Sequence, residues 1–202
     1  MALNFCNNNS LSAITSIPAA ISGGALNLIS TTTISSSTAS VSITSGIDST
    51  YKEYIFKFIN IHPATHNVIF QFNLSADGGS NYNATKTTTH FRAYHTEDDS
   101  ATDFAYRSAE DLAQSTDYQK LTGSVGNDDD SSCTGILRLF DPSSDTFVKH
   151  FIVEVQNMIG NASSRHDFVA GYANTTSAIN AIDFKFASGN IDSGVIKLYG
   201  VS

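Results

Sequence analysis

The six histidines are the side chains in this sequence best suited to chemistry, because imidazole binds metal ions and transfers protons near neutral pH. His90 and His95 stand five residues apart in an expected strand, so their side chains should point to opposite faces and share no metal ion. His62 and His66 flank a turn, but the neighbouring sequence supplies no third ligand. We interpret all six as surface or hydrogen-bonding residues, and we predict no metal site, cofactor or catalytic residue. They are His62, His66, His90, His95, His150 and His166.

The short motifs of common catalytic classes are missing from the sequence. It contains no G-x-S-x-G nucleophile elbow, no Gly-x-Gly dinucleotide fingerprint, no P-loop and no H-E-x-x-H zinc motif. Catalytic residues can be scattered along a chain, so a scattered-site hydrolase stays as the least favoured alternative. It would need a histidine near a carboxylate or hydroxyl group in a cleft. His166 stands beside Asp167, but neighbours in an extended segment point to opposite faces.

Two acidic clusters supply several oxygen atoms, which are the ligands that Ca²⁺ prefers. One comprises residues 97–99 with Asp103, and the other comprises residues 127–130. Neither has the alternating D-x-D-x-D-G pattern of a calcium loop, and consecutive carboxylates point apart unless the loop coils. We interpret both clusters as solvated loops that keep the surface charged.

Several tyrosines fall in or near expected loops and strand ends, where an aromatic ring suits sugar stacking, a protein interface or ordinary packing. If the protein binds a glycan, Tyr82 and Tyr118 are the candidate binding residues. The only two cysteines, Cys6 and Cys133, exclude a disulfide scaffold and a cysteine-rich zinc module, so we expect reduced thiols. The other tyrosines in such positions are Tyr94, Tyr106 and Tyr172.

The chain is acidic overall, and its first part carries no charged side chain. The formal net charge is −8, which argues against nucleic-acid binding because phosphate binding needs clustered Lys and Arg. No Asp, Glu, Lys, Arg or His occurs from Met1 to Ile47. This stretch has neither a basic signal-peptide start nor the roughly 18 consecutive apolar residues of a spanning helix. We therefore expect a chain that starts near Met1, folds in a cytoplasm and does not insert into a membrane.

Apolar residues alternate with polar ones along most of the chain, as Phe70, Phe72 and Leu74 do. This period of two predicts half-buried strands separated by turn-forming residues. Many short strands at regular spacing predict an all-β fold, an antiparallel β-sandwich of jelly-roll type, with a closed barrel as the competing architecture. The expected strands lie near residues 26–34, 39–44, 54–61, 70–74, 86–94, 117–122, 132–140, 147–155, 165–173, 182–186 and 195–200.

The uncharged start divides near Gly24. Residues 25–43 look like the first hairpin of a single sandwich domain, residues 25–202, and residues 1–24 remain as an extended N-terminal arm. Pro18 and the Gly23–Gly24 pair limit any helix in that arm. The one other helix candidate is Ser108–Gln114, where Ser108 would be the N-cap of two turns.

Five segments spread over nearly the whole chain, including the arm, carry a resemblance to known proteins. They are SLSAITSIPAAISGG (10–24), SITSGIDSTYKEYIFKFINIHPAT (42–65), THFRAYHTE (89–97), FDPSSDTFVKHF (140–151) and FKFASGNIDSGVIKLYGV (184–201). These segments resemble a family of virion structural proteins from tailed phages of marine bacteria and cyanobacteria. The resemblance implies a particle component of the tail-fibre or head-decoration type, and no catalytic motif belongs to it.

The sequence thus predicts a non-enzymatic virion protein, a capsid decoration or fibre module that assembles through its arm. A charge-free arm suits burial against other virion proteins, since unpaired charge is costly to desolvate. A homo-oligomer would protect sheet edges, and a trimer is one closed arrangement. The alternative is a carbohydrate-binding module that recognises a host surface glycan. The predicted partner-binding residues are Leu3, Phe5, Leu11, Ile14, Ile17 and Ile21.

Overall fold

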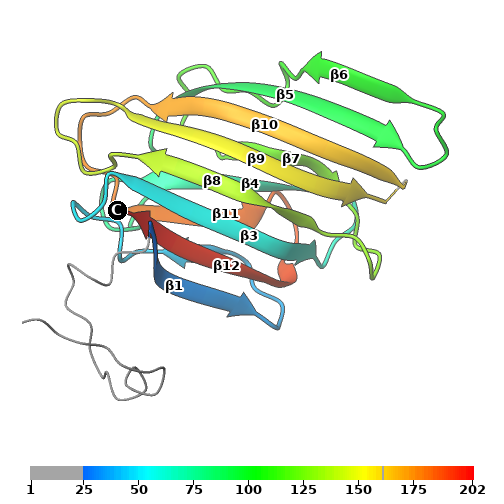
Figure 1. Ribbon diagram of the computed structural model, residues 1–202, viewed down its shortest axis with the longest axis horizontal. Coiled ribbons are helices and arrows are strands. Elements are labelled where there is room, and N and C mark those ends of the chain that lie inside the picture. Colours follow the sequence, from blue (N-terminus) through cyan, green and yellow to red (C-terminus); the bar gives the residue numbers. More distant parts are fainter. Residues whose placement is uncertain (1–24, 161) are drawn as a thin grey trace, which may run out of the picture.

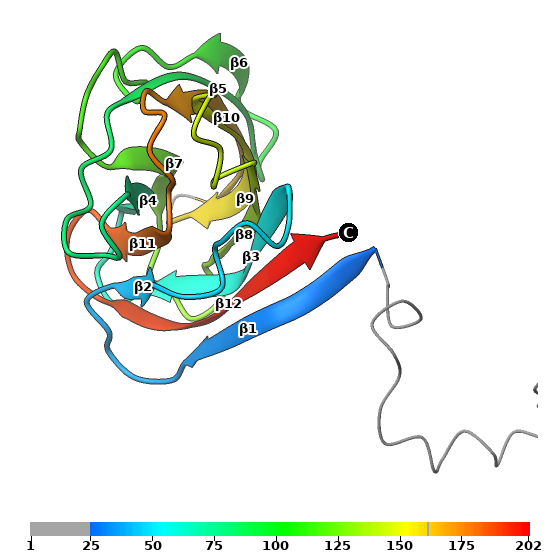
Figure 2. The same ribbon diagram turned by 90° about the vertical axis from the view of Figure 1, so that its left-hand side faces the viewer.

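The computed structural model describes residues 25–160 and 162–202 and places them in two antiparallel β-sheets packed face to face (Figures 1 and 2). In sheet order, the large sheet consists of β1 (Leu26–Ile34), β12 (Ile191–Val201), β3 (Glu53–Pro63), β8 (Cys133–Phe140), β9 (Lys149–Ile159), β10 (Ser163–Ala173), β5 (Lys86–Thr96) and β6 (Thr102–Tyr106). The small sheet consists of β2 (Val41–Ile43), β11 (Ala181–Phe186), β4 (Val68–Ser75) and β7 (Gln119–Val125).

The core lies between the two sheets and is built around one phenylalanine. Phe184 of β11 has ring-centroid distances of 5.0 to 6.4 Å to Phe56, Phe58, Phe70 and Phe72. All five rings are at most 1% exposed. They come from alternate positions of β3, β4 and β11, so the period of two in the sequence is the pattern of inward-facing side chains.

The predicted all-β class and β-sandwich architecture are confirmed. The two sheets share no strand pairing, so the competing closed barrel does not form among the described strands. Figure 2 shows the large sheet curving around the small one, with β1 and β12 at one end and β5 and β6 at the other. Every expected strand is present, several of them longer by two to five residues than the sequence indicated. The hairpin expected over residues 25–43 is wrong: β1 pairs with β12 and β2 with β11, so the two strands lie in different sheets.

The predicted helix at Ser108–Gln114 is wrong. This segment is a turn followed by extended chain, because its backbone pairs with β5 instead of with itself: Thr88 N donates to Leu112 O at 2.9 Å, and Lys86 N to Ser115 O at 2.8 Å. Within residues 25–160 and 162–202 the chain forms no helix. Tertiary hydrogen bonding has overridden the local capping signal.

Two strand details also differ from the prediction. Strand β6 was not expected, since its sequence TDFAY follows an acidic loop and carries a charge on one face. Phe147 lies outside β9 and is 67% exposed, whereas Lys149, the apparent exception on the inward face, is buried. Its ammonium donates to the backbone oxygens of Phe147 and Thr175, at 2.6 and 3.2 Å, which allows a lysine to sit in an inward position.

The predicted arm lies outside the described residues, and so do all six of its predicted partner-binding residues. The first described residue is Ala25, whose backbone oxygen accepts a hydrogen bond from Ser202 N at 3.3 Å. The start of β1 and the C-terminus are therefore neighbours (Figure 1). In the part of the chain that is described, no helix has the length and hydropathy needed to cross a bilayer.

Candidate functional site

The histidines that are close in sequence are not brought together as ligands. His90 faces the interior with no exposed surface, whereas His95 is on the outside, with Nε2 2.9 Å from Asp99 Oδ1. His62 and His66 both contact the loop after β7 instead of each other. His62 Nε2 is 3.2 Å from the backbone oxygen of residue 128, and His66 Nδ1 is 2.9 Å from the side-chain oxygen of residue 127.

A buried charged cluster forms where β5, β7 and β10 meet. Asp167 of β10 accepts hydrogen bonds on one carboxylate oxygen from His90 Nε2 at 2.7 Å and from Arg92 Nε at 2.6 Å. Its other oxygen accepts from Gly123 N of β7 at 3.1 Å, which connects the two sheets. Arg92 Nη1 also lies 3.6 Å from Glu110 Oε1. The cluster therefore satisfies a buried carboxylate with partners from both layers.

Gly123 packs closely against the arginines of this cluster. A Cβ there would lie 2.5 Å from Arg165 Nη1 and 2.9 Å from Arg92 Cζ, so any larger residue would displace the guanidinium groups. The side chains of His90 and Asp167 have no exposed surface, and that of Arg92 is 4% exposed. His90 Nδ1 has no hydrogen-bond partner among the described residues. His90 and Asp167 thus form the histidine–carboxylate pair that the scattered-site hydrolase alternative would need. A substrate would reach this pair only if the two sheets separated.

The pairing of His90 with Asp167 was not predicted. In the sequence Asp167 stands beside His166, whereas His90 is 77 positions away. The pairing of β10 with β5 places Val169 opposite His90 and Asp167 opposite Arg92, so the three side chains meet on the inward face. Only the strand register contains this information.

Lys86 is a second buried cation, at the start of β5. Its ammonium donates to Asn73 Oδ1 at 2.6 Å and to Ala84 O at 2.7 Å, and the side chain has no exposed surface. Burial lowers the pKa of Lys86 to about 8, and the charge of Asp117 opposes this shift only in part. The folded protein therefore releases this proton more readily than the unfolded chain does.

We expect Lys86 to make stability depend on pH above neutrality. Below pH 8 the lysine is charged in both states, and the desolvation cost is fully present in the folded state. Between pH 8 and the unfolded value of 10.5 the folded state loses the proton first, so stability rises with pH. From pH 7 to 10 the wild-type protein should gain about 2 kcal/mol relative to Lys86→Met in urea unfolding.

The matched control for this titration is Lys52→Met, because the Lys52 side chain is 80% exposed. We expect the difference between this variant and the wild-type protein to stay nearly constant over the same pH range. Titrations common to all three proteins cancel in these differences. Parallel pH profiles for the wild-type protein and Lys86→Met would contradict an effect of burial on this lysine.

The acidic clusters form loops stabilised by their own backbone and by neighbouring polar groups. Asp98 accepts hydrogen bonds from Ser100 N and Oγ at 3.1 and 2.6 Å, and Asp103 lies apart from the loop, within β6. Residues 129 and 130 line a polar hollow together with His62 and Asp192. Over the described ranges, no three His, Cys, Asp or Glu side chains gather in a way that could hold a metal ion.

The two tyrosines proposed for glycan binding lie near each other in connecting segments outside the strands. Tyr118 Oη donates to Asp183 Oδ2 at 3.0 Å, and Lys185 Nζ lies 4.1 Å from the centre of the Tyr118 ring. Burial, followed by the charge of Asp183, raises the pKa of Tyr118. The hydroxyl of Tyr82 is buried against Gly79 and Thr44. Both rings thus already have protein contacts, and their glycan role stays a prediction.

The outer face of the large sheet carries most of the exposed large apolar side chains. They alternate with the buried positions of the same strands, so they point away from the small sheet. Contiguous apolar patches of this kind mark interaction surfaces in soluble proteins. Those on the outer face are Leu26, Leu28, Ile59, Phe104, Tyr106 and Ile152, and only Phe147 lies in a loop.

One part of this face is an aromatic cluster on β5, β6 and β10. Phe91 and Phe168 stack with their ring centroids 4.9 Å apart, and Phe104 packs edge-on against Phe91 at 5.5 Å. His166 lies over Phe168 at 4.0 Å. Phe104 is nevertheless 69% exposed, because β6 is the last strand of the sheet.

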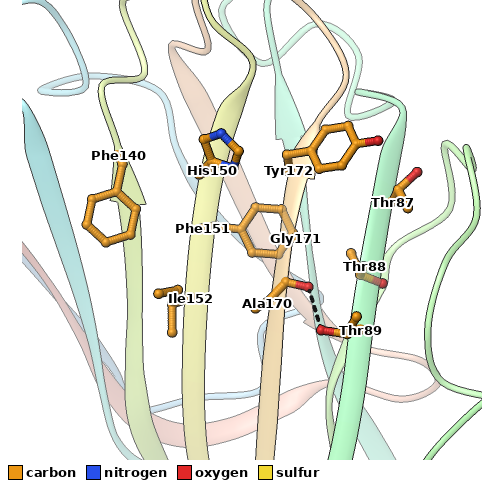
Figure 3. A pocket seen from close by; sticks show the side chains of 10 residues that line it. All are labelled: Thr87, Thr88, Thr89, Phe140, His150, Phe151, Ile152, Ala170, Gly171 and Tyr172. Atoms are coloured by element: carbon orange, nitrogen blue, oxygen red, sulfur yellow. Dashed lines mark hydrogen bonds between the residues drawn. The ribbon is translucent and has the colours of Figure 1, made fainter.

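The other part crosses the sheet at the end where β1 begins, and we call it the outer band. It ends in an open hollow of about 490 Å³ whose lining is mostly apolar. Figure 3 shows Phe140, His150 and Tyr172 following one another across adjacent strands, with Thr87 beyond them. The outer band consists of Leu26, Leu28, Tyr199, Phe140, Ile152 and Tyr172.

Comparison with models of known protein families gives no match for this chain, and no curated protein is detectably similar to it in sequence.

Proposed function

We propose that this protein is a non-enzymatic structural component of a tailed-phage virion, a capsid decoration or fibre module that assembles with other virion proteins. The observation that carries this proposal is the group of large apolar side chains on the outer face of the large sheet, which the described residues leave exposed. Such side chains are suited to assembly, since burial of apolar area drives association. The resemblance of five sequence segments to virion proteins points to the same role.

We also propose that the sandwich is a jelly roll enlarged by two hairpins. Without β5, β6, β9 and β10, the two sheets have the orders β1-β12-β3-β8 and β2-β11-β4-β7. These orders support the proposal because the chain then alternates between four-stranded sheets as a rolled-up double Greek key does. The hairpins β5–β6 and β9–β10 both extend the large sheet, and they supply half of its outer face.

A homo-oligomer on the particle is part of this proposal. Strands β1 and β6 are the edges of the large sheet, and exposed edges are protected in natural proteins by covering or pairing them. A closed ring such as a trimer would cover the same surface of every copy. The proposed site of action is the virion, after synthesis in the host cytoplasm.

Carbohydrate binding is the second candidate. It is supported by the closeness of Tyr82 to Tyr118, since neighbouring aromatic rings offer a sugar a stacking surface. The nearby Asp183 offers no acceptor, because this carboxylate is 2% exposed and already accepts from Ser42 Oγ and Tyr118 Oη. Carbohydrate binding has less support than assembly because Lys185 covers one ring face of Tyr118. Glycan-array binding that falls in Tyr118→Ala would favour it, whereas a flat array would count against it.

Particle incorporation tests the structural role. Mass spectrometry should detect the full chain in purified virions. The amount of a full-length variant with Ile14→Ser, Ile17→Ser and Ile21→Ser in the virions should be at least tenfold lower. The triple Leu variant at the same positions keeps the apolar character and should incorporate normally. Circular dichroism of the purified proteins checks that all of them fold. Absence of the unaltered chain from virions would overturn the function, and normal incorporation of the Ser variant would overturn anchoring by the arm.

A further inference from the structure

The outer band begins where the described chain begins. Leu26 pairs with Val201 at the first position of β1, and Leu28 pairs with Tyr199 two positions later. Both leucines point outwards, with exposed fractions of 44% and 56%. The same cross-strand row continues over β3, β8 and β9 to Ile152, which is 47% exposed. A band of exposed apolar side chains, interrupted by Arg138 and its partner Glu53, therefore leads from the start of β1 to the hollow at Tyr172.

This band presents little net charge. Glu53 and Arg138 lie within it and face each other, with Oε1 and Nη1 3.6 Å apart. Beside it are one more cation and one more carboxylate: Lys57 Nζ lies 5.1 Å from the centre of the Tyr199 ring, and Glu154 lines a hollow together with Phe140 and Ile152. The segment that precedes Ala25 has no charged residue at all, and its apolar residues include Leu11, Ile14 and Ile17. The two surfaces match in chemistry, because neither would leave an uncompensated charge when they are buried together.

The length of the arm is also sufficient. Twenty-four residues extend to at most about 80 Å, whereas the five strand spacings from β1 to β10 amount to about 24 Å. The direction of the chain decides which copy the arm can reach most directly. Strand β1 runs from Leu26 into the sheet, so an arm that bound the outer band of its own copy would have to reverse direction before Leu26, whereas docking on a second copy carries no such requirement.

We propose that the outer band is the docking surface for residues 1–24 of a second copy of this chain. The inference rests on the proposed function, because it names the partner of an arm that mediates assembly. The hollow at Phe140 and Tyr172 receives aliphatic side chains of the incoming arm. A sugar fits it poorly, because the threonine hydroxyls of its lining are already hydrogen-bonded within the protein, those of Thr87 with Gln114, Thr88 with Gln119 and Thr89 with Ala170 O.

Self-association in solution is the first test. Light scattering should give the full chain the mass of an oligomer, two or more times the 21.6 kDa of one chain. The variant Ile152→Asp should raise the apparent dissociation constant about tenfold or more, since it places a charge in the apolar contact. Phe104→Asp is the matched control on the same outer face but outside the outer band, and it should associate as the wild-type protein does. A monomeric full chain, or equal weakening by both variants, would overturn the proposal.

Cross-linking identifies which copy donates the arm. Cys6 belongs to the arm and Cys133 is fully buried, so a thiol introduced by His150→Cys beside the hollow can be paired with Cys6. Chains with His150→Cys and Cys6→Ser are mixed with wild-type chains and treated with a short bis-maleimide. A covalent heterodimer is expected. Its absence, or a cross-link only within single chains that carry His150→Cys and the native Cys6, would overturn docking between copies. Both tests are independent of virions, so their failure is distinguishable from failure of particle incorporation.

Discussion

Phe184→Ala should lower the free energy of unfolding by about 3–5 kcal/mol, measured by urea denaturation. The Phe184 ring contacts four other buried rings from both sheets, with centroid distances between 5.0 and 6.4 Å. Removing it takes away the transfer free energy of a large apolar group and leaves a cavity that the rigid sheets cannot close. The loss is large because one substitution removes the contacts that join β11 to both β3 and β4.

Phe147→Ala is the control for this prediction, because it makes the same chemical change at a side chain that is 67% exposed. We expect a change within about 0.5 kcal/mol. A similar loss of free energy of unfolding in the two variants would contradict a central role of Phe184 in the core.

The second large effect is expected at Asp167. Replacing Asp167 by Asn should cost about 3 kcal/mol or more, because the buried Arg92 then loses its nearest carboxylate and keeps only that of Glu110, at 3.6 Å. Asn keeps the size of the side chain, so the loss reports charge and hydrogen bonding and not a cavity. The measurement is again the free energy of unfolding, at one fixed pH.

Asp141→Asn is the matched control for Asp167→Asn. Asp141 also pairs with a cation, since Lys52 Nζ lies 2.9 Å from its carboxylate, but the lysine side chain is 80% exposed. An exposed pair of this kind contributes about 0–1 kcal/mol. A double variant with Asp167→Asn and Arg92→Met should lose less free energy of unfolding than the two single variants together, because the Arg92 charge that Asp167 compensates is then also absent. Strict additivity would contradict a coupled cluster.

Much of the fold could be predicted from the sequence because burial imposes a period of two on strands. The expected strand at residues 26–34 coincides with β1, and the expected strand at 132–140 differs from β8 by one residue. In β9 the inward positions Phe151, Val153 and Val155 are all at most 1% exposed, as their alternation indicated. Local pattern therefore sufficed wherever one face of a strand is buried.

The failures have a common cause, which is pairing with distant chain. Ser108 is a suitable N-cap residue, so the local sequence indicated a helix. The backbone oxygen of Leu112 instead accepts a hydrogen bond from β5. Strand β6 has little alternation, since as an edge strand it has few buried positions, and its sequence pattern is correspondingly weak. Lys149 appeared wrong for an inward position because only the folded chain supplies the carbonyl groups that satisfy its ammonium.

By itself, the sequence of this protein determined an all-β sandwich, the order of most strands along the chain and the uncharged start, because these follow from residue type and spacing. The tertiary structure alone decided that β5, β6, β9 and β10 extend one sheet, that His90 meets Asp167 inside it, and that an apolar band starts beside Leu26. Each of these depends on register between strands far apart in sequence. A shift of one residue would turn every side chain of a strand to its other face, and no local pattern reports that choice.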